Sequence, residues 1–249
     1  MEEIMHWASR HILVIELLLF ASYPVSAQDE AKALLDKAIA AHGGEKNLSA
    51  MQAGFIKAKG RLNLRDGLQF TQQTYYQLPD RLKEIQEFVG QKSVFTSVVN
   101  GDNAWITVNG QAQTLDKNII SELKEATYLL QVNRLIPLKE KNFQLSLLRQ
   151  DSVNGHLADG IKVTSEGHKD VHLYFDKESH LLVKLQRQAL DVNSGKEVKE
   201  ERFFSDFRPI NGIQEPQKVA ISRNGQKFVE AEVIEAKILE RLDPGIFEK

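Results

Sequence analysis

Cysteine is absent from the 249-residue sequence. The chain can therefore form no disulfide, thiolate metal site or cysteine nucleophile, so its hydrophobic core alone must hold the fold together. Long apolar runs are missing as well. After residue 27 no segment approaches the ~20 apolar residues that cross a membrane as a helix. No linker or low-complexity stretch divides the chain, which indicates a single domain over residues 28–249.

The sequence also lacks an excess of charge, with 32 Lys and Arg against 34 Asp and Glu. The first 27 residues contribute one basic and three acidic side chains, so the remainder has 31 of each sign and a net charge of zero. A nucleic-acid-binding protein needs a basic surface for the phosphates, and an anionic membrane attracts basic segments. We therefore expect no nucleic-acid partner and no tight electrostatic binding to a membrane.

Catalytic motifs are missing too: the sequence has no GxSxG elbow, no glycine-rich phosphate loop and no HExxH. His168 and His172 would lie about 13 Å apart along a strand, too far for one ion. A metal site would need a hairpin that returns His180 towards His172. Acidic residues such as Glu200 and Asp206 are expected at turns or on polar strand faces. We predict no catalytic residue, no cofactor and no metal.

The first residues have the pattern of an export signal. A basic residue precedes an apolar run at 12–21, and Val25 and Ala27 are the small residues that signal peptidase prefers at positions −3 and −1. The run is too short to span a bilayer of roughly 30 Å. We predict a signal peptide over residues 1–27 and a soluble periplasmic protein that is not a lipoprotein. A start at Met5 and a buried N-terminal helix remain alternatives.

Two segments have the periodicity of helices. The first, at 29–44, has Asp29 as its expected N-cap and an apolar stripe at helical spacing formed by Leu34, Leu35, Ala38 and Ile39. The second, at 116–138, has a broad apolar stripe and is expected to end at Pro137. These are the two helices that we predict.

Strands dominate the rest of the chain, where apolar residues alternate with polar ones. Turn dipeptides that favour positive φ separate these runs, namely Asp66-Gly67, Asn100-Gly101, Asn109-Gly110, Asn154-Gly155, Asp159-Gly160, Asn211-Gly212 and Asn224-Gly225. We count about ten or eleven strands, all close enough in sequence to be antiparallel. A sheet of this size must curl to hide its apolar face, and the two helices are the natural cover. The expected class is mainly β with two helices (α+β).

Several segments resemble a known family. "VHLYFDKESHLLVKLQRQA", "EERFFSDFRPINGIQEPQKVAISRNGQKFVEAEV" and the closing "LDPGIFEK" look like the periplasmic carriers that sort lipoproteins to the outer membrane, the Lol-type (LolA/LolB-like) superfamily. The matching positions form a set of turns and strand ends that we interpret as structural: Asp176, Asp206, Asn211, Gly212 and Pro216. Glu215 departs from the pattern, because relatives more often have an apolar residue there.

The resemblance implies a single open, strongly curved antiparallel half-barrel with helices on its concave face. It also implies that acyl chains bind between the sheet and the helices. The side chains that we predict to line this apolar cavity are Phe70, Tyr76, Phe88, Phe95, Trp105, Leu123, Leu130, Leu173, Phe175 and Phe203.

Three functions stay open at this point. The first is a non-enzymatic carrier for a lipid or for the acyl chain of a lipoprotein, with an envelope membrane protein as a further partner. The second is a structural or protein-interaction module of the envelope, which would have a closed core and a free edge strand or apolar patch. The third is an enzyme that acts on a small apolar substrate in the same cavity, which would need titratable groups on the concave face.

Overall fold

The computed structural model of the protein describes residues 27–63, 67–191 and 194–248. The strands are β1 (Ala53–Leu62), β2 (Leu68–Gln77), β3 (Arg81–Phe88), β4 (Val94–Asn100), β5 (Asn103–Val108), β6 (Gln111–Ala112), β7 (Phe143–Val153), β8 (His156–Ser165), β9 (Val171–Asp176), β10 (Leu182–Asp191), β11 (Lys196–Ile210), β12 (Ile213–Arg223) and β13 (Gln226–Leu239). The α-helices are α1 (Ala27–Ala41), α2 (Gly44–Ser49) and α3 (Lys117–Asn133), and the 3₁₀ helices are η1 (Ile136–Lys139) and η2 (Pro244–Phe247).

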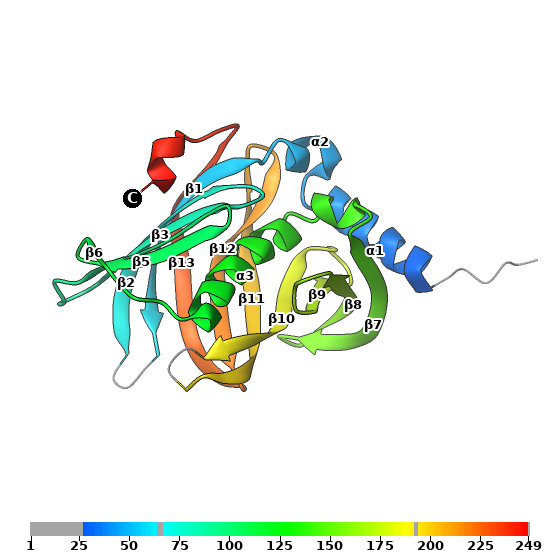
Figure 1. The fold of residues 1–249 in the computed structure, drawn as a ribbon. Coiled ribbons are helices and arrows are strands. Elements are labelled where there is room, and N and C mark those ends of the chain that lie inside the picture. The colour runs from blue at the N-terminus through cyan, green and yellow to red at the C-terminus, as the bar shows by residue number, and fades with distance from the viewer. Residues whose placement is uncertain (1–26, 64–66, 192–193, 249) are drawn as a thin grey trace, which may run out of the picture.

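All 13 strands of the described residues belong to one antiparallel sheet. Their order is β6-β5-β4-β3-β2-β1-β13-β12-β11-β10-β9-β8-β7, so the first strand pairs with the last and the two edges are β6 and β7. The sheet is open and curls around α3 (Figure 1). The predicted class, a mainly β protein with an open, curved antiparallel sheet, is confirmed. The predicted number of about ten or eleven strands was too low, since the described residues form 13, one of them the two-residue β6. Helix α2 was not predicted.

Asn-Gly turns separate several of these strands, as predicted. Both residues have positive φ in Asn109-Gly110, Asn154-Gly155, Asn211-Gly212 and Asn224-Gly225, as a type I′ turn requires. At Asn100-Gly101 only the glycine has positive φ, and Asp66 lies outside the described residues. The prediction of a turn at Asp159-Gly160 was wrong, because both residues lie inside β8. Here glycine allows a close approach: a Cβ on Gly160 would lie 2.8 Å from the Cβ of Leu148 and 3.0 Å from the Tyr174 ring.

The two predicted helices exist with different ends. α1 already includes Ala27, so Asp29 lies in its first turn and is not the N-cap. Apart from Ala27, the predicted leader lies outside the described residues. α3 begins after Asp116, whose Oδ1 accepts a hydrogen bond from the Ile119 amide at 2.9 Å. The predicted end at Pro137 was wrong: α3 ends at Asn133, and Pro137 belongs to η1.

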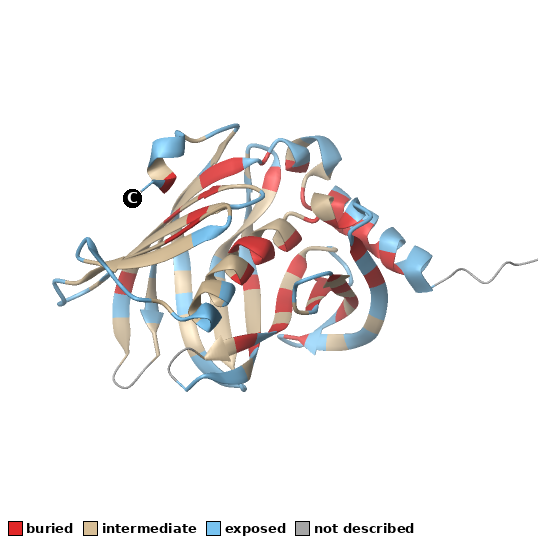
Figure 2. Ribbon diagram, in the orientation of Figure 1, coloured by how far each residue is buried: buried red, intermediate tan, exposed pale blue. Residues whose placement is uncertain are grey.

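Two hydrophobic clusters cover part of the concave side of the sheet. The larger one lies under α1 and includes Leu35, Ile161 and Phe175, and the smaller one lies under α3 around Tyr76, Leu82 and Val99. In Figure 2 the buried residues form bands on α1, α3 and the strands of the curled half of the sheet. α3 crosses the hollow of the sheet, with contacts to β4 and β5 at one side and to β10 at the other. The space between the two clusters therefore lies beneath α3.

Candidate functional site

A pocket of about 290 Å³ lies between α3 and the concave face of strands β1, β2 and β11–β13. This volume is at the lower end of the range for small-molecule sites, which is roughly 300–1,000 Å³. The register places Ala58 opposite Gln72 on one side and Val233 on the other, so alternate residues of neighbouring strands face the pocket together. The apolar side chains that line it are Leu48, Ile56, Ala58, Phe70, Leu130, Leu182, Phe204, Phe207, Ile213, Pro216, Val219, Ile221, Val229, Ala231, Val233 and Ala236.

Small residues on β1 let aromatic rings of β2 pack closely against the strand beside the pocket. Three of the β1 residues on the concave face are Gly54, Ala58 and Gly60, as their register with β2 shows. A Cβ on Gly60 would lie 2.6 Å from Cζ of Phe70 and 2.5 Å from the carbonyl oxygen of Glu230. The missing side chain therefore lets the Phe70 ring lie against the strand.

The polar end of the pocket contains a buried ion pair. Nη1 of Arg134 donates to Oε1 of Glu215 at 2.7 Å, and Nη2 donates to the hydroxyl of Tyr76 at 2.8 Å. Burial opposes the charge on Arg134, but Glu215 and Tyr76 outweigh it and raise the pKa of the guanidinium. Arg134 follows the last turn of α3, where a cation also complements the helix dipole. Arg134 and Glu215 were not predicted from the sequence.

Other polar atoms reach the same pocket. Gln72 and Thr74 lie between Phe70 and Tyr76 on one face of β2, and alternation alone could have identified them. Gln72 also donates to Oε1 of Glu84 at 3.0 Å, and burial raises the pKa of Glu84. Two buried polar atoms at the pocket have no hydrogen-bond partner in the described structure: Nε of Arg134 and Oδ1 of Asn133. Unsatisfied buried atoms of this kind are uncommon and require an explanation.

A second charge network fixes one end of α3 to the sheet. Glu200 is only 1% exposed and accepts hydrogen bonds from Arg187, Arg202 and Arg223 at 2.9–3.3 Å. Arg187 also binds Glu122, a residue of α3. Burial opposes ionisation of Glu200, but the three guanidinium groups outweigh it and lower its pKa to about 2. The prediction that Glu200 lies at a turn or on a polar face was therefore wrong.

His168 gives α3 another contact. Its Nδ1 lies 2.8 Å from Oε1 of Glu125, and its ring stacks on Tyr128 with centroids 3.8 Å apart. His172 points to the outer face of β9, since it lies between Val171 and Leu173, which face the core. Within the described ranges no group of three or more His, Asp or Glu is arranged to hold a metal ion.

The predicted cavity residues fall into three groups. Phe70 and Leu130 line the pocket. Leu173 and Phe175 are fully buried in the cluster under α1, and Tyr76 and Leu123 pack in the cluster under α3.

The remaining four predicted residues lie elsewhere. Phe88 and Phe95 contact each other edge to face at 5.7 Å on the concave side of β3 and β4, beyond the pocket lining. Trp105 lies between Ala104 and Ile106 on β5, so its side chain is on the outer face. Phe203 packs with Tyr174 on the outer face as well. Trp105 and Phe203 therefore do not line the pocket under α3.

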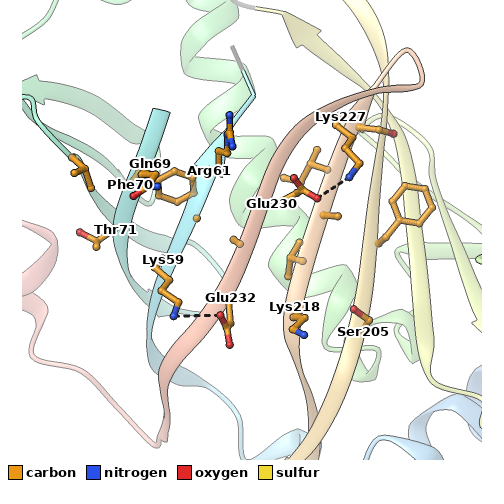
Figure 3. Close-up of a pocket in the computed structure, with 18 of the residues that line it drawn as sticks. Lys59, Arg61, Gln69, Phe70, Thr71, Ser205, Lys218, Lys227, Glu230 and Glu232 are labelled. Carbon is orange, nitrogen blue, oxygen red and sulfur yellow. Dashed lines mark hydrogen bonds and ion pairs between the residues drawn. The ribbon is translucent and has the colours of Figure 1, made fainter. Parts of the chain in front are cut away.

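The outer face has a larger groove of about 820 Å³ across β2, β1, β13, β12 and β11 (Figure 3). Its lining contains two ion pairs, Lys59 with Glu232 at 3.4 Å and Lys227 with Glu230 at 3.0 Å. These side chains are roughly half exposed or more. A hydrocarbon chain in this groove would lie among hydrated charges, so the pocket under α3 is the better apolar site.

No family model matches the sequence, and no curated protein is similar to it. The fold, however, is similar to solved structures. A LolA superfamily protein from Nitrosomonas europaea aligns over 88% of this chain and 97% of its own, with 12% identity and a TM-score of 0.56. A domain described as an outer membrane lipoprotein-sorting protein from Vibrio parahaemolyticus aligns over 90% and 97%, with 11% identity and a TM-score of 0.53. A DUF1329 family protein from Desulfovibrio piger aligns over 88% and 97%, with 13% identity and a TM-score of 0.55.

Proposed function

We propose that this chain, which has the LolA-like fold, is a non-enzymatic carrier that binds a lipid or the acyl chain of a lipoprotein under α3. The observation that supports this most is the pocket itself, since the part of the concave side beneath α3 is not filled by the protein's own side chains. Its apolar floor suits a hydrocarbon chain, because each methylene that leaves water contributes about 0.8 kcal/mol. The leader predicted over residues 1–27 supports a periplasmic location. No helix in the described part of the chain is long and apolar enough to cross a membrane.

Two matched substitutions test whether the ligand binds in the pocket under α3. Ala58 faces the pocket from β1, and Ala220 faces the outer groove from β12. Ala58→Phe fills the pocket, so we expect the affinity for a fluorescent acyl probe to fall at least about tenfold, equivalent to ~1.4 kcal/mol. Ala220→Phe introduces the same ring on the other face and should leave the affinity unchanged.

The measurement is a fluorescence titration of the wild-type protein and both variants. Native mass spectrometry of gently purified protein should also show a bound lipid that is lost from Ala58→Phe. Equal affinity in all three proteins would contradict the proposed location of the ligand. A loss caused by Ala220→Phe alone would move the site to the outer groove.

A protein-interaction module is the second candidate, and the outer groove is the observation that favours it. The groove is wide, and Val89 beside it is 64% exposed. Exposed apolar side chains rimmed by charges are typical of protein contact surfaces. An envelope protein bound there would be a partner of the carrier and not an alternative to the lipid. Loss of such a partner from Ala220→Phe, with lipid binding intact, would separate the two roles.

The enzyme alternative is less well supported, because the histidine at the pocket is fully engaged. Nδ1 of His42 lies 2.8 Å from the Ala38 carbonyl oxygen, and Nε2 is 3.2 Å from the Leu182 amide nitrogen, whose hydrogen it accepts. Burial lowers the pKa of His42, which agrees with a neutral ring that donates through Nδ1 and accepts through Nε2. No nitrogen of this ring is available to a substrate. His42 therefore serves as a link between the end of α1 and β10.

A further inference from the structure

The charged side chains that line the pocket under α3 all have partners within the protein. Its charged lining residues in the described structure, apart from neutral His42, are Arg134, Arg202 and Glu215. Arg134 is paired with Glu215 at 2.7 Å, whereas Arg202 shares Glu200 with Arg187 and Arg223. At the Arg134 end the guanidinium therefore already has its own counter-charge and needs none from a ligand.

Glu215 occupies the position that a ligand carboxylate would take beside Arg134. Its side chain is 19% exposed and that of Arg134 is 11% exposed, so solvent screens the pair only weakly. A second carboxylate near Arg134 would meet the charge of Glu215 in an environment of low dielectric constant, where like charges repel strongly. It would also lose its hydration on entry. A fatty-acid anion is therefore poorly matched to this end of the pocket.

Two buried atoms of the lining residues Arg134 and Asn133 lack a hydrogen-bond partner, and an uncharged polar group that reaches them can satisfy both. The N–H at Nε of Arg134 is a buried donor without a partner, and a carbonyl oxygen can accept from it without adding charge. The buried Oδ1 of Asn133 is an acceptor without a partner and can take a hydrogen bond from an amide N–H or a hydroxyl. An ester or amide that joins an acyl chain to its headgroup provides such a carbonyl.

We infer that Glu215 is a specificity-determining residue, which makes the pocket select acyl chains attached through an uncharged ester or amide and reject free fatty-acid anions. This inference rests on the proposed lipid-binding function. It goes further, because it assigns a role to one ion pair and names the chemical class that the pair excludes.

The test compares two ligands with the same hydrocarbon chain, 1-monolauroylglycerol and laurate, at pH 8 by calorimetric or fluorescence titration. The wild-type protein should bind the glycerol ester at least about tenfold more tightly than laurate. In Glu215→Gln the guanidinium loses its internal counter-charge, so laurate should bind at least about tenfold more tightly than it binds the wild type. The ester should change by less than about threefold. Glu232→Gln, which removes a carboxylate from the outer groove, is the matched control and should change neither affinity.

A second variant is needed because Glu215→Gln leaves a buried cation unpaired and can impair folding. The double substitution Arg134→Met with Glu215→Leu removes both charges, and replacing a buried pair by apolar residues is often neutral for stability. It should gain no affinity for laurate. Equal wild-type affinity for both ligands, or an unchanged ratio in Glu215→Gln, would overturn the role of Glu215 while leaving the carrier function intact. Failure of the wild type to bind either ligand would instead refute the proposed function, and the inference with it.

Discussion

Replacing Glu200 by alanine is expected to lower the free energy of unfolding by roughly 3–5 kcal/mol, because three arginines would lose their shared counter-charge. Glu200 accepts hydrogen bonds from Arg187, Arg202 and Arg223, which come from three neighbouring strands. Arg187 is itself only 5% exposed and would remain buried with Glu122 alone. For a protein of this size such a loss lowers the melting temperature by on the order of 10 °C. Urea unfolding followed by circular dichroism measures the change.

Glu197→Ala is the matched control for this substitution. Glu197 lies on the same strand, β11, but its side chain is 61% exposed and pairs with Lys169 at the surface. Removal of an exposed pair changes the free energy of unfolding by ~1 kcal/mol or less. If both variants lost the same small amount of stability, the network around Glu200 would not stabilise the fold as we describe.

The stability contributed by the ion pairs of Glu200 should depend on pH. The pKa of Glu200 falls from 4.5 to about 2 in the folded protein. A lowered pKa means that the ionised side chain stabilises the folded state above pH 4.5, and that this contribution is lost as the pH falls towards 2. The shift corresponds to roughly 3 kcal/mol. The difference in unfolding free energy between wild type and Glu200→Ala should therefore shrink across this pH range. A constant difference would show that the charge of Glu200 is not responsible.

Local sequence signals predicted much of the fold, because they act between neighbouring residues. The φ preferences of Asn-Gly pairs set four of the turns, and alternation set the faces of β2 and β9. The same signals failed at Gly160, where glycine serves a close contact between strands and not a turn. They failed again at the end of α3, because Leu135 adopts a positive φ before Pro137 is reached.

The pocket was harder to predict than the sheet, because it depends on contacts between residues far apart in sequence. Arg134 and Glu215 are 81 residues apart, and nothing local to either side chain shows that they meet. Glu200 lies in the run "KEVKEE", which has the composition of an exposed strand. Its burial follows only from the register that brings it level with Arg187 and Arg223. Alternation assigns a residue to a face of the sheet, but it does not say which part of that face a helix covers.

Two of the predicted cavity leucines should therefore differ in how much stability their replacement by alanine costs. Leu173 is fully buried in the cluster under α1, whereas Leu130 is half-buried and faces the pocket from α3. Leu173→Ala should lower the free energy of unfolding by about 2–5 kcal/mol through the cavity that it leaves in a close-packed core. Leu130→Ala borders space that is already open, so the loss should fall below this range.

Stabilisation by the ligand should be reduced in Leu130→Ala but not in Leu173→Ala, the reverse of the order expected for the loss of unfolding free energy. A ligand at 100 times its dissociation constant stabilises the folded state by about 2.7 kcal/mol. Leu173→Ala leaves the pocket lining unchanged, so this stabilisation, measured as the rise in melting temperature with 1-monolauroylglycerol, should persist. Leu130→Ala removes an apolar contact with the acyl chain and should reduce it. If Leu173→Ala abolished ligand stabilisation while Leu130→Ala preserved it, the acyl chain would lie under α1 and the pocket under α3 would not be the binding site.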